Sequence, residues 1–177
     1  MPTYVLGISA YYHDSAAALL VDGWIRAAAQ EERFTRKKHD SGFPSHAINY
    51  CLSEAGISAS QLDYAGFYDK PGAKFDRLIT TLGEFAPASL GVYLRSVPMW
   101  LRTKLHLKRE IERSLGNGYR GKTLFADHHE SHAASAFFPS PFKDAAILTI
   151  DGAGEWSTTT LGHGKGNQLQ LLREIRF

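Results

Sequence analysis

The residues of this chain that are best suited to chemistry are two histidines, His128 and His132, which stand four positions apart. If segment 127–132 is helical, the two imidazoles share one face and can converge on a single metal ion. A carboxylate must complete such a site, and Asp151 is the natural candidate. It follows the run 145–150, which reads as a buried strand whose end would deliver Asp151 to the edge of a sheet. Two imidazoles and a carboxylate oxygen suit a divalent transition metal such as iron, zinc or manganese.

The other polar residues of this segment are assigned supporting roles. His129 would point about 100° away from His128 on a helix, so we expect it to support the ligands or the fold rather than to bind the metal. Glu130 lies on another face and could reach a substrate. A zinc-protease motif needs H-E-x-x-H, but the histidines that flank Glu130, His129 and His132, are one residue too close. The alternative without a metal is a helix capped by Asp127 with its histidines on a solvated face.

Two turns form the second feature that could do chemistry. One spans residues 9–16 and the other spans 151–157, and both contain glycine or other small residues. Such residues let the backbone approach a ligand closely, and turn N–H groups can surround an anion. Neither turn matches a Walker A loop or a dinucleotide-binding motif, so the alternative is that the glycines serve only a hairpin. The candidate residues for binding phosphate or a nucleotide are Gly152, Ala153, Gly154 and Glu155.

His13 and Asp14 stand at the lip of the first turn. A neutral imidazole at His13 could act as a general base near neutral pH. Asp14 is a candidate for supporting that histidine or for contacting a substrate. The alternative is an exposed histidine beside an aspartate that shapes the turn by bonding to its own backbone. The spacing alone leaves both interpretations open.

The strands and helices that must position these residues follow from hydrophobic patterning and turn signals. Asp22 and Gly23 are typical of a tight hairpin, whereas Pro44 and Gly56 mark the start and end of a helix. The resulting order is β-β-β-α-β, followed by a helical insertion, a further strand and the histidine helix, which Asp127 can cap. The expected elements are strands over 4–8, 15–21 and 24–30, a helix over 43–55, a strand over 62–68, the insertion 72–115, a strand over 122–125 and a helix ending near 137.

The last third of the chain starts the same strand pattern again. Strands are expected over 145–150, 156–162 and 168–177, with turns between them. Because each copy carries an acidic residue and small residues at its first turn, the sequence indicates an internal structural repeat. We therefore expect a first lobe over residues 1–142 and the beginning of a second, duplicated lobe over 143–177.

The insertion and its surroundings carry an excess of basic residues. Segment 93–122 has eight lysines and arginines against two glutamates, with apolar residues between them. One interpretation is a helix that binds a membrane surface or a nucleic acid. We favour a helix that packs through its apolar side and leaves its basic face solvated. A third interpretation is that the insertion covers the acceptor site and sets its specificity.

The composition excludes several classes of protein. A chain of 177 residues with 44% hydrophobic content and a net charge of +2 is ordinary for a globular protein, and this charge is too small to indicate nucleic-acid binding by the whole chain. Cys51 is the only cysteine, so no intrachain disulfide can form, and its setting indicates a buried apolar position. The sequence shows no signal peptide and no membrane-spanning run, so we expect a cytoplasmic protein without a membrane or nucleic-acid partner.

Several segments together resemble the carbamoyltransferase family of nodulation and antibiotic-tailoring enzymes. Segments 127–137 and 145–156 carry the clearest resemblance, and segments 6–9, 12–19 and 30–38 are similar to the N-terminal signature of that family. The resemblance covers nearly the whole chain and is weakest in the insertion. It implies an α/β fold of the actin-like/Hsp70-like ATPase (ribonuclease H-like) type, in which two lobes duplicate a β-β-β-α-β-α pattern.

The resemblance also implies a chemistry. In such enzymes a histidine pair and a following aspartate bind a metal, usually iron, and these positions match His128, His132 and Asp151. Carbamoyl phosphate and ATP give a carbamoyl-adenylate, and the carbamoyl group then passes to a hydroxyl or amine of a small-molecule acceptor. Within this scheme His13 would take the acceptor proton, and the backbone of residues 152–154 would hold the adenylate phosphate.

Full members of that family are longer than this chain. They add the rest of the second lobe, with a further aspartate ligand, and a C-terminal YrdC-like domain that forms the adenylate. That domain and a homodimer are the expected partners, and the isolated chain is expected to have an incomplete metal shell and little or no transfer activity. Two other classes stay open: a sugar-kinase-like ATPase of the same fold, which needs no paired-histidine metal site, and a non-catalytic binding module.

Overall fold

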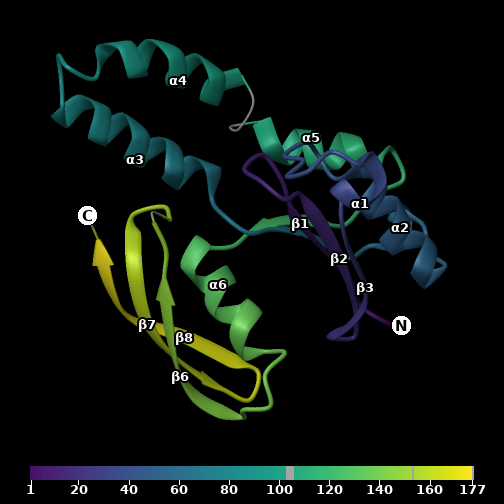
Figure 1. The fold of residues 1–177 in the computed structure, drawn as a ribbon. Coiled ribbons are helices and arrows are strands. Elements are labelled where there is room, and N and C mark those ends of the chain that lie inside the picture. The colour runs from purple at the N-terminus through teal and green to yellow at the C-terminus, as the bar shows by residue number, and fades with distance from the viewer. Residues whose placement is uncertain (103–105, 153, 177) are drawn as a thin grey trace. The chain divides into compact units, whose positions relative to one another are not determined.

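The protein is described here by a computed structural model that covers residues 1–102, 106–152 and 154–176. Within these residues, no helix combines the length and the apolar character needed to cross a membrane. The chain forms two compact units, which are described separately (Figure 1): Met1–Tyr68 with Leu107–Phe125, and Asp69–His106 with Ala126–Phe177.

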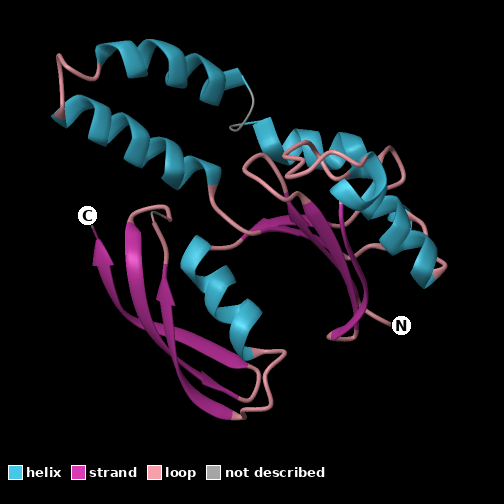
Figure 2. Ribbon diagram, viewed as in Figure 1, coloured by secondary structure: helices cyan, strands magenta, loops and turns pink. Residues whose placement is uncertain are grey.

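A five-stranded mixed sheet organises the first unit. Its elements are β1 (Tyr4–Ser9), β2 (Ala16–Val21), β3 (Trp24–Gln30), α1 (Glu32–Thr35), α2 (Ser45–Ala55), a 3₁₀ turn (Ala59–Gln61), β4 (Tyr64–Phe67), α5 (Leu107–Leu115) and β5 (Lys122–Phe125). Strand β2 pairs antiparallel with β1 and β3, while β4 and β5 extend the sheet in parallel, which gives the order β3-β2-β1-β4-β5 (Figure 2). The predicted β-β-β-α-β order is confirmed, and this is the ribonuclease H-like arrangement that the family resemblance implies.

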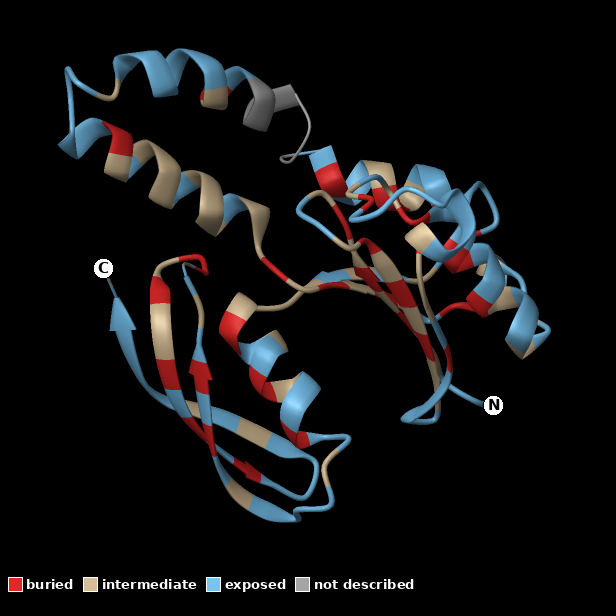
Figure 3. Ribbon diagram, viewed as in Figure 1, coloured by how far each residue is buried: buried red, intermediate tan, exposed pale blue. Residues whose placement is uncertain are grey.

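One face of this sheet carries the core of the first unit. The strand register aligns Leu6 with Leu19 on one side and with Ala65 on the other, and all three are fully buried. Buried residues also stand on the helices of this unit (Figure 3). Helices α2 and α5 pack on this core, and their buried residues are Ala47, Ile48, Cys51, Leu107, Ile111 and Leu115. The buried position predicted for Cys51 is therefore confirmed. The packed-helix interpretation of the basic segment is confirmed for α5, which keeps its apolar side in the core.

Local sequence determines the turns of the first unit. Asp22 and Gly23 have positive φ values of 51° and 85°, as the predicted hairpin between β2 and β3 requires. Gly56 ends α2 in the left-handed conformation, with φ of 65°. The buried carboxylate of Glu31 accepts two backbone N–H groups in the first turn of α2, at 3.1 and 2.8 Å. Glu31 thus satisfies backbone donors that a helix start otherwise leaves unpaired.

The second unit combines helices with a three-stranded antiparallel sheet. Its elements are α3 (Pro71–Glu84), α4 (Leu90–Arg102), α6 (His128–Phe137), β6 (Asp144–Ile150), β7 (Ser157–Lys165) and β8 (Gln168–Arg176). The strands pair in the order β6-β7-β8, and α6 packs on the sheet through Ala133 and Phe137, which form a cluster with Ile147. Gly164 makes this packing feasible, because a Cβ at that position would stand 2.7 Å from the Phe137 ring.

The burial of β6 differs from the prediction. The strand exists where the sequence predicts it, but it is not buried on both faces: Ile147 and Thr149 are buried, whereas Leu148 and Ile150 are 59% and 74% exposed. The physical reason is that α6 packs against one face of the sheet, so successive side chains of β6 alternate between the core and the outside.

Packing divides the chain differently from the sequence repeat. Helix α6 belongs to the same compact unit as β6, although the expected first lobe extends to residue 142. The lobes are predicted from a repeated order of strands, whereas the compact units are defined by contacts between residues. The lobes 1–142 and 143–177 therefore stay a prediction.

The 72–115 insertion is also divided between the two units, because α3 and α4 fall in the second unit and α5 in the first. Within the basic segment 93–122, Leu94 at the start of α4 is 63% exposed, so the interpretation of a helix packed through its apolar side does not hold there.

Candidate metal centre

Helix α6 and strand β6 deliver the three predicted metal ligands. Asp127 is the N-cap residue of α6, and its carbonyl accepts the backbone N–H of Ser131 at 2.9 Å. His128 and His132 follow one turn apart, with ring centroids 4.7 Å apart and ring planes at 82°. Asp151 comes directly after the last residue of β6. The helical spacing and the strand end therefore act as the sequence predicts.

The three side chains converge on one point. Nε2 of His128 lies 2.7 Å from Oδ2 of Asp151 and 3.2 Å from Nε2 of His132. Nε2 of His132 lies 3.7 Å from the same carboxylate oxygen. Ligand atoms that share a metal at about 2.1 Å in a tetrahedral arrangement stand about 3.4 Å apart. The observed triangle is close to that size, so these three residues fit a bound metal ion after small adjustments.

The surroundings favour the ligating forms of two of these groups. Burial lowers the pKa of His128 and so favours the neutral imidazole. The hydrogen bond to Asp151 opposes this effect but does not outweigh it. Burial acts to raise the pKa of Asp151, but hydrogen bonds from His128 and from the Gly152 backbone N–H outweigh it and hold that pKa below its ordinary value. Metal binding needs a neutral imidazole and an ionised carboxylate, and both shifts act in that direction.

Gly154 packs directly against the histidine helix. A Cβ at this position would stand 3.0 Å from Cδ2 of His128 and 2.9 Å from Cδ2 of His129. Side-chain atoms do not tolerate contacts this short without movement, because the interior is already close-packed. The turn after β6 can therefore approach α6 this closely only because residue 154 is glycine.

His129 is buried, and its ring fastens α6 to the sheet. Nε2 lies 2.6 Å from the carbonyl oxygen of Ser157, and it must carry the hydrogen because a carbonyl can only accept. In the neutral ring Nδ1 then accepts from the hydroxyl of Thr149 at 2.6 Å, and Thr149 in turn accepts from Thr160 at 2.6 Å. These bonds use both ring nitrogens of His129, which leaves neither for a metal.

Helix α3 and Lys70, the residue before it, contribute contacts to this site that the sequence did not predict. The backbone N–H of Lys70 donates to Oε1 of Glu155 at 2.6 Å, and the guanidinium of Arg77 donates to the carbonyl of Gly154. The Lys70 ammonium group donates to the carboxylate of Asp127 at 2.7 Å. Asp127 is therefore an N-cap residue by position, but its side chain does not cap α6 as predicted, because it pairs with Lys70 instead.

The sequence contained a signal for these contacts. Lys70, Lys74 and Arg77 are spaced so that they follow one face along the start of α3. Lys74 pairs with the buried Asp69. Burial raises the pKa of Glu155, although the Lys70 backbone hydrogen bond opposes this effect. A basic face on α3 thus lies beside the acidic groups and the carbonyl of the turn.

In the turn predicted to bind phosphate, two backbone N–H groups already donate hydrogen bonds within the protein. The N–H of Gly152 donates to Oδ1 of Asp151 at 2.7 Å, and the N–H of Gly154 donates to the carbonyl of Ser157 at 3.1 Å. Ala153 lies outside the described residues. A phosphate at these two N–H groups would have to replace internal hydrogen bonds, so phosphate binding by the turn stays a prediction.

The remaining predicted residues do not join the cluster of ligand atoms. Glu130 is exposed on α6 and lines a depression with Ala134 and Gln168. His13 and Asp14 belong to the first unit, where Nδ1 of His13 lies 2.8 Å from Oδ2 of Asp14. The His13 side chain is 60% exposed.

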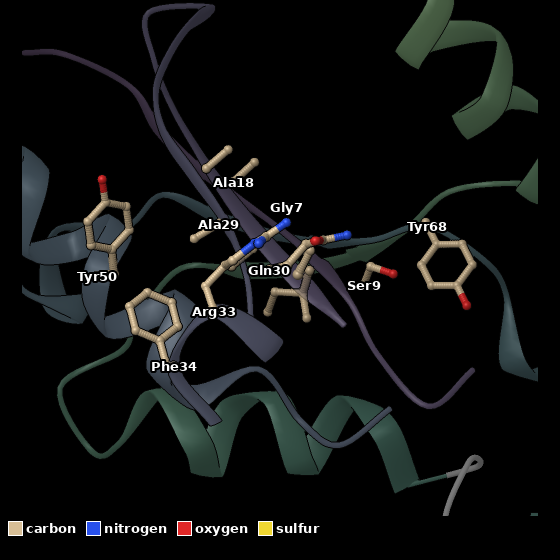
Figure 4. Close-up of a pocket in the computed structure, with 13 residues that line it drawn as sticks. Gly7, Ser9, Ala18, Ala29, Gln30, Arg33, Phe34, Tyr50 and Tyr68 are labelled. Carbon is tan, nitrogen blue, oxygen red and sulfur yellow. The ribbon is translucent and has the colours of Figure 1, made fainter. Parts of the chain in front are cut away.

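A pocket of about 720 Å³ lies in the first unit (Figure 4). Its lining is mostly apolar, with Gly7, Ala18 and Ala29 on the strands and the rings of Phe34 and Tyr50 on one side. None of the predicted site residues that the structure describes lines it. Volume alone does not indicate chemistry, so the histidine cluster rather than this pocket is the candidate functional site.

The sequence comparisons show one family. The family model described as Carbamoyltransferase N-terminus matches residues 4–177. The uncharacterised protein sll1178 of Synechocystis is 56% identical over 99% of this chain and 29% of its own length. Nodulation protein NolNO of Sinorhizobium fredii is 34% identical over 92% of this chain and 23% of its own length. The chain therefore spans less than a third of these relatives. YeaZ from Pseudomonas aeruginosa aligns in structure with 99% of this chain and 67% of its own, at 14% identity and a TM-score of 0.46.

Proposed function

Because the chain belongs to the carbamoyltransferase family and matches its N-terminal region, we propose that it is part of a carbamoyl-transferring enzyme. The proposed enzyme transfers the carbamoyl group to a hydroxyl or amine of a small-molecule acceptor. The proposed donor is carbamoyl phosphate. In the proposed activation it is hydrolysed to carbamate and phosphate, and the carbamate oxygen then displaces pyrophosphate from ATP, which gives a carbamoyl-adenylate. The chain spans 29% and 23% of the two relatives, so the complete activity is proposed for the longer protein.

The observation that carries this proposal is the convergence of His128, His132 and Asp151. Their three ligand atoms lie within 4.8 Å of one another. The family resemblance implies the same three residues as metal ligands. A sugar kinase or a simple binding module needs no such cluster. The paired histidines and the aspartate therefore favour metal-assisted transfer over these alternatives.

The family resemblance favours iron, and the donor set of two imidazoles and a carboxylate suits iron, zinc or manganese. When bound, such a metal would supply Lewis acidity toward a carbonyl or phosphoryl oxygen. His128, His132 and Asp151 would hold it, while Gly154 and His129 keep the histidine helix in register with the turn. Residues 152–155 are the proposed contact to the phosphate of the adenylate.

His13 is the proposed base for the acceptor. During transfer, the acceptor oxygen or nitrogen forms a bond to the carbamoyl carbon, and the bond from that carbon to the adenylate oxygen breaks, which releases AMP. The acceptor proton passes to Nε2 of His13. The exposure of this side chain and the engagement of its Nδ1 by Asp14 support the assignment.

The 177-residue chain alone is expected to have little or no transfer activity. Its three ligands leave the metal shell open, and the proposed partners are a YrdC-like domain that makes the adenylate and a second copy of the protein. The cytoplasm is the proposed location.

The test uses the full-length protein with carbamoyl phosphate, ATP and iron(II), and hydroxylamine as a probe acceptor. We expect hydroxyurea and AMP to form in equal amounts, and the His132→Ala variant to lose both products. His163→Ala, which changes an exposed histidine that pairs with Asp144, is the matched control and should retain activity. Formation of ADP without any need for carbamoyl phosphate would contradict the proposal and favour a kinase.

A further inference from the structure

A single carboxylate joins two histidines in the first unit. Oδ2 of Asp14 lies 2.8 Å from Nδ1 of His13, and Oδ1 lies 2.9 Å from Nδ1 of His39. Each carboxylate oxygen thus meets one imidazole, and in both rings the nitrogen involved is Nδ1. The two histidines come from loops that are far apart in sequence, so Asp14 is the point at which these loops meet.

The chemistry of a carboxylate determines where the ring hydrogens are. Hydrogen bonds from His39 and His13 hold the pKa of Asp14 below its ordinary value, so the carboxylate is ionised near neutral pH and can only accept. Nδ1 of each imidazole must therefore carry a hydrogen. A neutral imidazole has one N–H, so Nε2 of His13 is left with a lone pair that can take a proton.

The backbone on both sides of this contact adopts an unfavourable conformation. Asp14 and His39 have φ values of 52° and 55°, in the left-handed region that residues other than glycine seldom occupy. The loops are held there by specific bonds: the N–H of Ser15 donates to the Asp40 carbonyl at 2.8 Å, and the N–H of His39 donates to the Glu32 carboxylate at 3.0 Å. Such conformations persist where the surrounding structure enforces a particular geometry, and they are concentrated at functional sites.

We propose that Asp14 is the positioning residue for His13. The Asp14 carboxylate fixes the Nδ1–H tautomer and the orientation of the His13 ring, so that Nε2 is the base. His39 holds the carboxylate in place. That the proton comes from a hydroxyl or amine of the acceptor rests on the proposed function. The tautomer of His13 does not depend on that function. After proton transfer His13 is an imidazolium, and the Asp14 carboxylate stabilises its charge through the Nδ1–H bond.

The first test is the tautomer of each histidine in the 177-residue chain, measured by ¹⁵N NMR above the pH at which the rings titrate. His13 and His39 should both carry the hydrogen on Nδ1. His163 is an internal control for the opposite case, because its Nε2 lies 2.7 Å from the Asp144 carboxylate. It should show the Nε2–H tautomer in the same spectrum. A neutral His13 with its hydrogen on Nε2 would overturn the proposal, and this measurement needs no variant.

The second test is Asp14→Asn, with Asp144→Asn as the matched control. Asparagine tolerates the left-handed backbone of position 14, but its side chain offers one accepting oxygen where aspartate offers two. The tautomer population of His13 should shift toward Nε2–H in Asp14→Asn and stay unchanged in Asp144→Asn. An unchanged His13 in a folded Asp14→Asn protein would overturn the proposal.

Activity separates the positioning role from the proposed function. In the full-length enzyme, Asp14→Asn should lower kcat for transfer to hydroxylamine by about 10-fold or more, because general-base catalysis typically contributes at least that much. If the tautomers are as expected but His13→Ala transfers at the normal rate, the base assignment in the proposed function fails. If His13→Ala is inactive and Asp14→Asn is fully active, the positioning role fails.

Discussion

Gly154 lies so close to His128 that a methyl group on its α-carbon would stand 3.0 Å from Cδ2 of that imidazole. The same methyl group would stand 2.9 Å from Cδ2 of His129. The turn after β6 is therefore in direct contact with the helix that carries two candidate metal ligands. A change in the turn must move these ligands, although residue 154 itself offers no ligand atom.

Replacing Gly154 with alanine should displace α6 from the turn. We expect a loss of about 1–3 kcal/mol in the free energy of unfolding, because an added methyl group overpacks a filled contact. The affinity for Co²⁺ or Fe²⁺ should fall as His128 moves away from Asp151. Urea denaturation and metal titration of the purified chain measure the two effects.

Gly152→Ala is the matched control for this experiment. A Cβ at Gly152 meets no atom within 4 Å, and the residue does not have a left-handed backbone. The control should change the stability by about 0.5 kcal/mol or less. Equal effects of the two substitutions would show that the contact between Gly154 and α6 has no special role.

Replacing His129 with alanine should destabilise the second unit without removing a metal ligand. The variant leaves the Ser157 carbonyl without its imidazole donor, and the hydroxyl of Thr149 loses its acceptor. We expect a cost of about 1–3 kcal/mol, which is typical for buried polar groups that lose a partner. Urea denaturation checks it.

The control for this prediction is His163→Ala, because that histidine pairs with Asp144 at the surface. Its stability should lie within about 0.5 kcal/mol of the parent. A His129→Ala protein as stable as the control would mean that the buried network does not hold α6.

The contact between Asp14 and His39 should depend on pH in a defined direction. The hydrogen bond and the charge of Asp14 raise the pKa of His39, so this stabilisation is complete below about pH 6.5 and is lost as pH rises through the folded-state pKa. Hydrogen bonds from His39 and His13 lower the pKa of Asp14, so its contribution is complete above about pH 3.9 and is lost on acidification through the folded-state pKa.

An NMR titration of the His39 ring checks this expectation. The pKa should lie above 6.5 in the parent chain and return toward about 6.5 in Asp14→Asn. A pKa for His39 that does not respond to the substitution would contradict the contact.

Much of the candidate site follows from local rules. His128 and His132 share a face because helices repeat every 3.6 residues, and Asp151 meets them because β6 ends just before it. The hairpin at Asp22 and Gly23 is equally local. The shared face of His128 and His132 and the hairpin could be predicted because each depends on residues that are close in sequence. Asp151 lies 23 positions from His128, so its place at the end of β6 could be predicted, but its contact with His128 also needs α6 to pack on the sheet.

Other features depend on contacts between distant segments. Arg77 meets Gly154 across 77 positions and Lys70 meets Asp127 across 57, and no local pattern specifies where α3 lies against the turn. The same limitation explains why the prediction for the burial of β6 is wrong. The apolar sequence of the strand does not reveal that Leu148 faces away from α6. The partnership of Asp14 with His39 also needs the three-dimensional path of two loops.

His128, His132 and Asp151 are proposed to form one metal site. The most direct measurement is the metal content of the purified full-length protein after it is loaded with Fe²⁺ or Co²⁺ and desalted, determined by elemental analysis. We predict about one ion per chain in the parent and in His163→Ala, and a loss of that ion in His128→Ala, His132→Ala and Asp151→Asn. Unchanged stoichiometric metal in these three variants, with folding verified by circular dichroism, would contradict the account.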